Sequence, residues 1–492
     1  MRKTEIPDVD FTFLTSKYQT YHYRHLYGFA KWLHQELSGK NITPTEKAPL
    51  LIFADNSDEV IFIIAASFLL NIPIFPLHPD STTFEIDQAL SQINPSARFY
   101  GNKNPFAKLD ELPPISIQPR HIHIPGEFDS ALFHLNSTDL IAGYFLTSGT
   151  SSASKIVPIK RKQVFAAADS SSDNLKPDKN RYWLLCMPLN HVGGINVIYR
   201  SLIYQSAIYS VPSFDANEIR IILNNNPTFE AASMVPTMLS KLMEDKFFKP
   251  HLNFQGLLLG GGPIDPDMIE QAVTRGIPVI TSYGMTETCA QIAANPMLKP
   301  GGRYIPKKSV GPVFKENSVE IRSENGTPVR YNEPGQIWLK GPQLFDGYVN
   351  PNDSRRVFDR DGWFNTGDYG HLNKYGHLFV ENRREDRIIT GGENVNPNEV
   401  ELEINKMDSI SESAVIGVPD KKWGQKVVAF IVTKNDLAPS VDEMEATLRD
   451  SLRGFKIPKE FIPVKNLPKT PMMKVKKGEL LKAYLENMNS EF

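Results

Sequence analysis

Residues 50–100 read LLIFADNSDEVIFIIAASFLLNIPIFPLHPDSTTFEIDQALSQINPSARFY, and this stretch decides the fold class. Short apolar runs alternate in it with longer segments of helical spacing. The apolar runs lie at residues 50–53, 72–76 and 97–100, and the helical segments at 58–70 and 84–93. Strand–helix–strand alternation places strands side by side with helices on their faces. The sequence therefore predicts an α/β fold with a mostly parallel sheet.

The same alternation resumes further along the chain. Strands are expected at residues 182–187, 207–211, 231–235, 256–259 and 277–282, with helical segments between them. Two successive blocks of this kind predict two similar βα-layered subdomains. Residues 101–137, rich in Pro and His, are expected to form a connection with short irregular strands.

Beyond Pro300 the pattern changes to short strands at residues 318–321, 335–340 and 377–380, which predicts a small β-rich subdomain. A charged run at residues 381–387 follows; such runs are typical of solvated turns, and this one is also a candidate linker. The remainder alternates on a smaller scale and has the size of a compact α+β domain. We therefore expect a large N-terminal domain, residues 1–384, and a small C-terminal domain, residues 385–492.

Composition excludes several functional classes. The chain of 492 residues has 41% hydrophobic and 22% charged residues and a net charge of −2, so nothing indicates nucleic-acid binding. Its two cysteines have no metal-ligand or disulfide spacing, and the N-terminus lacks the apolar core of a signal peptide. The longest apolar run, residues 60–70, is too short to cross a bilayer. We expect a cytoplasmic protein with no transmembrane segment.

Residues 146–155, LTSGTSSASK, carry the first chemical signal. Small residues let a backbone approach an anion closely, and hydroxyls, N–H groups and the ammonium of Lys155 donate to phosphate oxygens. The stretch is not a Walker loop, because Ser154 stands where that motif has its second glycine. Taken alone, this composition is more typical of a solvated loop.

Further candidate residues follow the expected strands. Residues 260–263, GGGP, permit close approach to a flat ligand or form a tight structural turn. Residues 282–288, SYGMTET, place an aromatic ring, a glycine, hydroxyls and a carboxylate in sequence, which suits a base, a phosphate and Mg²⁺. In Thr366-Gly367-Asp368, a carboxylate follows a turn and is suited to a ribose diol.

These motifs together resemble the adenylate-forming superfamily of acyl- and aryl-CoA synthetases, luciferases and carrier-loading adenylation domains. The phosphate loop, SYGMTET, TGD, NRREDRIITGGENVNPNEVE and LPKTPMMKVKKGEL occur in that family's order and approximate spacing, over roughly residues 146–480. LLLGGGPI, SYGMTETCAQ and GGENVNPNEVE look most like the o-succinylbenzoate–CoA and 4-chlorobenzoate–CoA ligases. The resemblance implies that an acid is joined to the α-phosphate of ATP, and that its acyl group then passes from AMP to CoA.

The resemblance also implies residue roles, with ATP, Mg²⁺ and CoA as cofactors and a small-molecule carboxylic acid as substrate. The ATP phosphates would be held by Thr147, Ser148, Gly149, Thr150, Ser151, Lys155 and Thr286. The adenosine would be held by Gly261, Gly262, Pro263, Tyr283, Gly284, Asp368 and Arg383, and Glu287 would ligate Mg²⁺. His191 would gate the acyl pocket, although a structural histidine fits equally; Val192, Gly193, Gly260, Met285 and Ala290 would form its walls.

The C-terminal domain resembles a mobile one that pivots in relatives at an Asp or Lys, here Glu385. Lys474 would bridge the carboxylate and the α-phosphate, or it is one more surface lysine in a basic tail. After rotation, Gly391 and Gly392 would leave room for the pantetheine arm, and Trp423 would contact CoA, unless it packs in the core.

Three positions depart from the family pattern: Ser152 replaces a glycine, Ser154 a proline, and Met473 the glycine before the lysine. An aryl acid such as o-succinylbenzoate is the favoured substrate. The alternatives are a medium- or long-chain acyl-CoA ligase, an enzyme that loads a carrier protein, and, least favoured, a non-catalytic nucleotide sensor.

Overall fold

The computed structural model describes residues 5–101, 109, 111–147, 155–299, 301, 307–383, 388–390, 393–420, 423–434, 439–470 and 473–489. The chain divides into two compact units. The first contains Met1–Val319, Leu339–Phe364 and Gly376–Leu378; the second contains Glu320–Trp338, Asn365–Tyr375 and Phe379–Phe492. The expected boundary after residue 384 falls outside the described residues and stays a prediction.

A five-stranded sheet of the first unit has the order β5-β3-β4-β6-β7. Its strands are β3 (Leu50–Phe53), β4 (Ile74–Leu77), β5 (Ala97–Tyr100), β6 (Ile141–Leu146) and β7 (Ile156–Lys160). The pairs among β3, β4, β5 and β6 are parallel, as the alternation predicts, whereas β6 and β7 form an antiparallel hairpin. The hairpin connection, residues 147–155, contains most of the predicted phosphate loop.

An eight-stranded sheet of the same unit has the order β13-β12-β11-β10-β8-β9-β1-β2. Its strands are β1 (Thr12–Thr15), β2 (Thr20–His22), β8 (Tyr182–Leu185), β9 (Ala207–Ser210), β10 (Phe229–Met234), β11 (Gly256–Leu259), β12 (Val279–Met285) and β13 (Ala290–Ala294). All pairs from β1 to β12 are parallel, and the outer strands β2 and β13 are antiparallel. The two predicted βα-layered blocks thus form two sheets.

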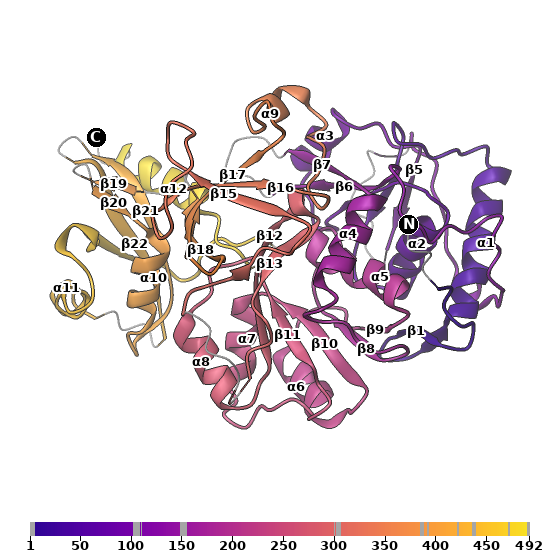
Figure 1. The fold of residues 1–492 in the computed structure, drawn as a ribbon, viewed down its shortest axis with the longest axis horizontal. Helices are drawn as coiled ribbons and strands as arrows, with labels where there is room; N and C mark the ends of the chain where they lie inside the picture. Colours follow the sequence, from indigo (N-terminus) through magenta and orange to yellow (C-terminus); the bar gives the residue numbers. More distant parts are fainter. Residues whose placement is uncertain are drawn as a thin grey trace. The chain divides into compact units, whose positions relative to one another are not determined.

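Helices pack against both sheets of the first unit. They are α1 (Tyr23–Gly39), α2 (Asp58–Leu69), α3 (Thr83–Leu90), α4 (Arg161–Ser171), α5 (Val192–Tyr204), α6 (Ala216–Asn225), α7 (Pro236–Met243) and α8 (Pro266–Thr274). The short helix α9 (Pro351–Arg355) has no buried residue. Helix α2 contacts α1 and α5, and α5 contacts α4 (Figure 1). Every α2 residue from Val60 to Leu69 is buried, so the longest apolar run of the sequence is a core helix.

One sequence expectation is wrong. In the described part of residues 101–137, the expected short strands are replaced by the 3₁₀ helix η2 (Pro119–His123) and a single β-bridge between Arg98 and Pro114. The backbone of this connection instead bonds to neighbouring elements, as in the 2.8 Å hydrogen bond from Gly126 N to Arg24 O. Prolines explain the difference, because they withhold N–H donors that strands need.

The β-rich region forms a sheet of order β14-β18-β17-β16-β15, whose residues are divided between the two units. Its strands are β14 (Gly311–Pro312), β15 (Ser318–Arg322), β16 (Gly335–Lys340), β17 (Phe364–Leu372) and β18 (His377–Arg383). The three short strands expected from the sequence correspond to β15, β16 and β18. Strand β16 has the predicted bounds, and β15 and β18 end at Arg322 and Arg383, beyond the predicted residues 321 and 380.

The C-terminal part of the second unit is α+β, as expected. Its sheet has the order β20-β19-β22-β21, with β23 also paired to β22. The elements are β19 (Ile388–Thr390), β20 (Glu393–Val395), α10 (Pro397–Asn405), β21 (Ile410–Asp420), β22 (Gly424–Thr433), α11 (Val441–Arg449), the 3₁₀ helix η4 (Gly454–Lys456), β23 (Glu460–Pro463) and α12 (Lys477–Asn489). Within the described residues, no helix has the length and apolarity that a bilayer crossing requires.

Candidate active site

The base of the phosphate loop is fixed by the β6–β7 hairpin. Leu146 pairs with Ile156, and Thr147 N donates to Lys155 O at 2.9 Å, which closes the connection. Ser148, Gly149, Thr150 and Ser151 lie outside the described residues, as do Ser152 and Ser154. The described part therefore places Thr147 and Lys155 opposite each other, at the two ends of the loop.

Two predicted motifs meet at the carboxyl ends of the neighbouring parallel strands β11 and β12. Leu259 pairs with Thr281, so Gly261, Gly262 and Pro263 follow β11 where Tyr283 and Gly284 continue β12. Gly261 has φ +76°, a conformation that favours glycine. Ligands of open α/β sheets bind outside such strand ends, so the structure brings these residues together where a ligand is expected.

Strand β12 continues to Met285 and leads into the 3₁₀ helix η3 (Thr286–Thr288). Gly284 faces the backbone of β13 so closely that a Cβ there would lie 1.9 Å from Ala290 O. Thr288 Oγ1 accepts from Met285 N at 3.0 Å and donates to Ala290 O at 2.6 Å, which holds the turn. Thr286 and Glu287 are therefore presented at the end of β12 by a turn that requires glycine.

Glu287 and Lys155 both contact Tyr348, an aromatic residue outside the sequence motifs. Tyr348 Oη donates to Glu287 Oε1 at 2.7 Å, and Lys155 Nζ lies 4.9 Å from the centre of the Tyr348 ring. The sequence signal for this residue is the pair Gly347-Tyr348 in a polar segment. The contact spans 61 residues, however, so local pattern does not reveal it.

His191 directly precedes helix α5 and is partly buried. Burial, reinforced by His78, lowers the pKa of its imidazole to about 4, so the ring is neutral at pH 7. Gly194 allows the chain to turn into the helix, because a Cβ there would lie 2.2 Å from Pro188 O. A neutral ring at a helix start near Val192 and Gly193 fits both an acyl-pocket wall and a structural histidine.

The second unit holds Asp368, Lys474 and Trp423. Asp368 lies buried within β17 rather than after a turn, and Gly367, with φ +76°, distorts the strand beside it. Asp368 N donates to Thr366 Oγ1 at 3.1 Å. The expected turn before Asp368 is therefore wrong, because residues 366–368 belong to β17.

Lys474 lies in a tight turn. Thr470 N donates to Lys474 O, and Met473 N to Thr470 O, both at 2.8 Å. Met473 has φ 59°, in the left-handed region, which explains physically why the family pattern has glycine there. The departure at Met473 therefore carries backbone strain.

The described part of the proposed CoA site is Trp423. Trp423 is 43% exposed, so it is not a core residue, and Trp423 N donates to Asp420 Oδ1 at 2.9 Å. Gly391 and Gly392 lie outside the described residues, as does the side chain of Arg383 at the end of β18.

The side chains near the predicted phosphate site include one carboxylate suited to Mg²⁺. Among the described residues, no group of three or more His, Cys, Asp or Glu could hold a metal. Mg²⁺ needs no such cage, because it is usually bound by one or two carboxylates together with substrate phosphates and water. The carboxylate of Glu287, which accepts a hydrogen bond from Tyr348, fits that mode.

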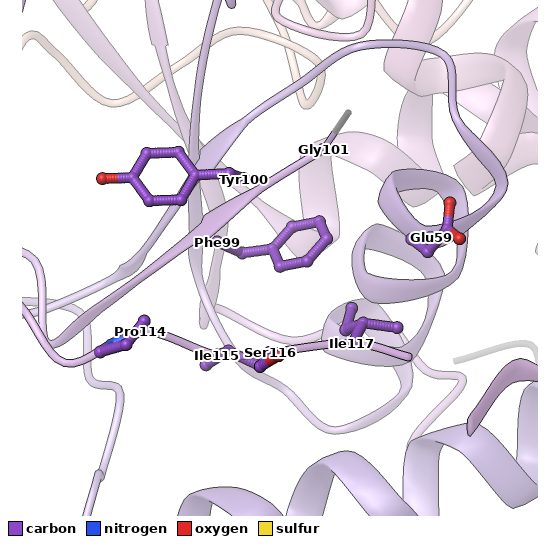
Figure 2. Close-up of a pocket in the computed structure, with 8 residues that line it drawn as sticks. All are labelled: Glu59, Phe99, Tyr100, Gly101, Pro114, Ile115, Ser116 and Ile117. Atoms are coloured by element: carbon purple, nitrogen blue, oxygen red, sulfur yellow. The ribbon is translucent and has the colours of Figure 1, made fainter. Parts of the chain in front are cut away.

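A separate pocket of about 290 Å³ lies at the end of β5 (Figure 2). It is lined by Glu59, Phe99, Tyr100, Gly101, Pro114, Ile115, Ser116 and Ile117. None of these residues belongs to the predicted nucleotide or acyl sites, so the pocket is distinct from the strand ends described above.

The AMP-binding enzyme family matches residues 5–349, and the AMP-binding enzyme C-terminal domain matches residues 399–474. The chain belongs to the AMP-binding enzyme family, which confirms the resemblance seen in its motifs. It is an adenylate-forming enzyme with a large N-terminal and a small C-terminal domain.

Several individual proteins and solved structures are similar to this chain. The chain is 31% identical over 448 residues to the 2-succinylbenzoate–CoA ligase of Enterococcus faecalis, covering 89% of both chains. It is 36% identical over 341 residues to that of Listeria monocytogenes serotype 4b, covering 69% of both. The o-succinylbenzoate CoA synthetase of Bacillus subtilis in complex with OSB-AMP has a TM-score of 0.86 and 27% identity, with coverage of 96% of this chain and 95% of that one. The same enzyme with ATP and magnesium gives a TM-score of 0.84 at the same identity, with 96% of each chain covered.

Proposed function

We propose that this chain is an ATP-dependent 2-succinylbenzoate–CoA ligase. It adenylates the acid with release of pyrophosphate and then transfers the acyl group to CoA, giving acyl-CoA and AMP. The observation that carries the nucleotide part is the constellation of Lys155, Tyr348 and Glu287. The acid is proposed from the relatives, which are named for 2-succinylbenzoate and align with this chain over most of their length.

In the adenylation step, the chain must bring two anions together. Lys155, Thr147, the loop residues 148–151 and Thr286 neutralise and orient the ATP phosphates, so that catalysis is mainly charge stabilisation and positioning. Tyr283 with Gly284 and residues 261–263 hold the adenine, and Asp368 with Arg383 the ribose. When bound at Glu287, Mg²⁺ supplies charge neutralisation on the phosphates.

In the thioester step, we propose that the C-terminal domain, residues 385–492, moves relative to residues 1–384. Lys474 serves adenylation alone, because its ammonium bridges the acid carboxylate and the α-phosphate. Gly391, Gly392 and Trp423 then serve CoA. His191, neutral at pH 7, borders the acyl pocket without adding a charge. Two free, buried cysteines suit a reducing cytoplasm, which we propose as the location.

The test is ATP–pyrophosphate exchange with a panel of carboxylic acids, repeated with CoA to detect thioester. Exchange and thioester with 2-succinylbenzoate are expected. A fatty acid that reacts while 2-succinylbenzoate is inert would make the chain an acyl-CoA ligase of other specificity. Exchange without thioester would indicate carrier loading, and no exchange with any acid would indicate a nucleotide sensor.

Lys474→Ala tests the division between the steps. We expect adenylation to fall by roughly 10²-fold or more, while supplied acyl-adenylate is still converted to thioester. Lys476→Ala is the matched control, because Lys476 belongs to the same basic tail and pairs with Glu479 at 2.9 Å. Equal loss of both half-reactions in Lys474→Ala would contradict the role.

A further inference from the structure

Tyr348 is held firmly by its own segment. Tyr348 N donates to Ser354 Oγ at 2.8 Å, and the ring packs edge-on against Phe345 with 4.8 Å between ring centres. Gly347 has φ 134°, and a Cβ there would lie 2.8 Å from Ser354 Oγ, so glycine permits this approach. The ring position is therefore set before any ligand binds.

The same segment is tied to both motifs of the nucleotide site. Phe345 N donates to Glu287 O at 2.8 Å, and Val349 N donates to Ile156 O, next to Lys155, at 3.0 Å. Residues 345–349 thus bond to the turn that carries Glu287 and to the base of the phosphate hairpin. Tyr348 lies between these two anchors.

The side chain of Tyr348 meets two opposite charges in two different ways. Its hydroxyl donates to the Glu287 carboxylate, which fixes the orientation of that group with a charge-assisted hydrogen bond. Its ring face receives the Lys155 ammonium, a contact weaker than a direct ion pair with a carboxylate or phosphate. An ammonium held in this way can leave the ring for a phosphate oxygen at low cost.

We propose that Tyr348 is a positioning residue for nucleotide binding, which keeps Glu287 and Lys155 oriented and separate. A direct Lys155–Glu287 ion pair would have to be broken before phosphate and metal could bind, because each charge would already be neutralised. This inference rests on the proposed roles of Glu287 and Lys155. It adds that the orientation of both side chains before ATP and Mg²⁺ bind depends on Tyr348.

Two variants separate the hydroxyl from the ring. Tyr348→Phe keeps the ring face for Lys155 and loses the bond to Glu287; Tyr348→Leu loses both. ATP binding is measured by calorimetry without acid, first in EDTA and then across a Mg²⁺ titration. For Tyr348→Phe we expect unchanged affinity in EDTA and a Mg²⁺ midpoint raised about ten-fold. For Tyr348→Leu, affinity falls in EDTA as well.

Phe345→Leu is the control for packing, because it alters the contact with the ring and removes no charge contact. Its Mg²⁺ midpoint should equal that of the unsubstituted protein. An unchanged or lowered midpoint in Tyr348→Phe, or an equal shift in Phe345→Leu, would overturn the inference. Glu287→Gln distinguishes a failure of the proposed role of Glu287 from a failure of the role of Tyr348. If ATP binding by Glu287→Gln still depends on Mg²⁺, the proposed role of Glu287 is wrong. If that dependence is lost while Tyr348→Phe has an unchanged Mg²⁺ midpoint, only the role of Tyr348 is wrong.

Discussion

Acidification should destabilise the first unit through His191. Burial beside His78 lowers the pKa of this imidazole from the ordinary value of 6.5 to about 4. Between those two values the unfolded chain binds a proton that the folded chain does not. The free energy of unfolding therefore falls as the pH falls through this window, and the contribution is fully present above pH 6.5. From pH 7 to pH 5 the expected loss is about 2 kcal/mol.

Urea unfolding, followed by tryptophan fluorescence at pH 7 and pH 5, measures this loss. Burial also lowers the pKa of His25 and His121, so the wild-type slope alone does not isolate His191. His191→Gln provides the comparison, because glutamine has no charge at either pH. The unsubstituted protein should lose about 2 kcal/mol more than His191→Gln. Equal losses, or an NMR titration of His191 with a midpoint near 6.5, would refute the reasoning.

Three further outcomes are expected. Gly284→Ala should reduce adenylation by roughly 10²-fold, measured by pyrophosphate exchange, because its Cβ would clash with Ala290 O and displace Glu287; normal exchange would contradict this. Met473→Gly should stabilise the second unit by up to about 1 kcal/mol in urea unfolding, because the left-handed conformation at φ 59° ceases to be strained; a loss of stability would show that the Met473 side chain contributes more. Trp423→Ala should raise the KM for CoA about ten-fold and leave pyrophosphate exchange unchanged, since Trp423 is 43% exposed; destabilisation without a KM effect would indicate a structural role.

The alternation of apolar and helical segments was sufficient to predict the parallel strands β3, β4, β5 and β8 to β12 of the two sheets, because parallel strands buried on both faces read as short continuous apolar runs. The run at residues 50–53 is the strand β3 with the same bounds. The N-terminal elements β1, β2 and α1 were not predicted. Helix α1 nevertheless has an apolar stripe at helical spacing, with Leu26, Ala30, Leu33 and Leu37 on its buried face, so this signal was present in the sequence and was missed.

The position of the candidate site was predictable where a chemical motif directly follows an expected strand, as in residues 282–288, which lie at the end of β12 and in η3. It was not predictable where function depends on a contact between distant segments. Tyr348 and Glu287 are 61 residues apart in the sequence, and a local pattern in a single sequence does not predict such a contact. Likewise, the strain at Met473 is a backbone property that residue identity suggests but does not establish.

In the β6–β7 hairpin, we expect the stability of the sheet to depend on the strands, and ATP affinity to depend on the loop between them. The hydrogen bond from Thr147 N to Lys155 O and the pairing of β6 with β7 hold the two ends of the loop through the backbone. Substitutions such as Ser152 and Ser154 can then accumulate without cost to the sheet. A library randomised over residues 148–154 should therefore yield variants that mostly fold yet differ in ATP affinity, which makes this loop a place where nucleotide use can evolve independently of stability.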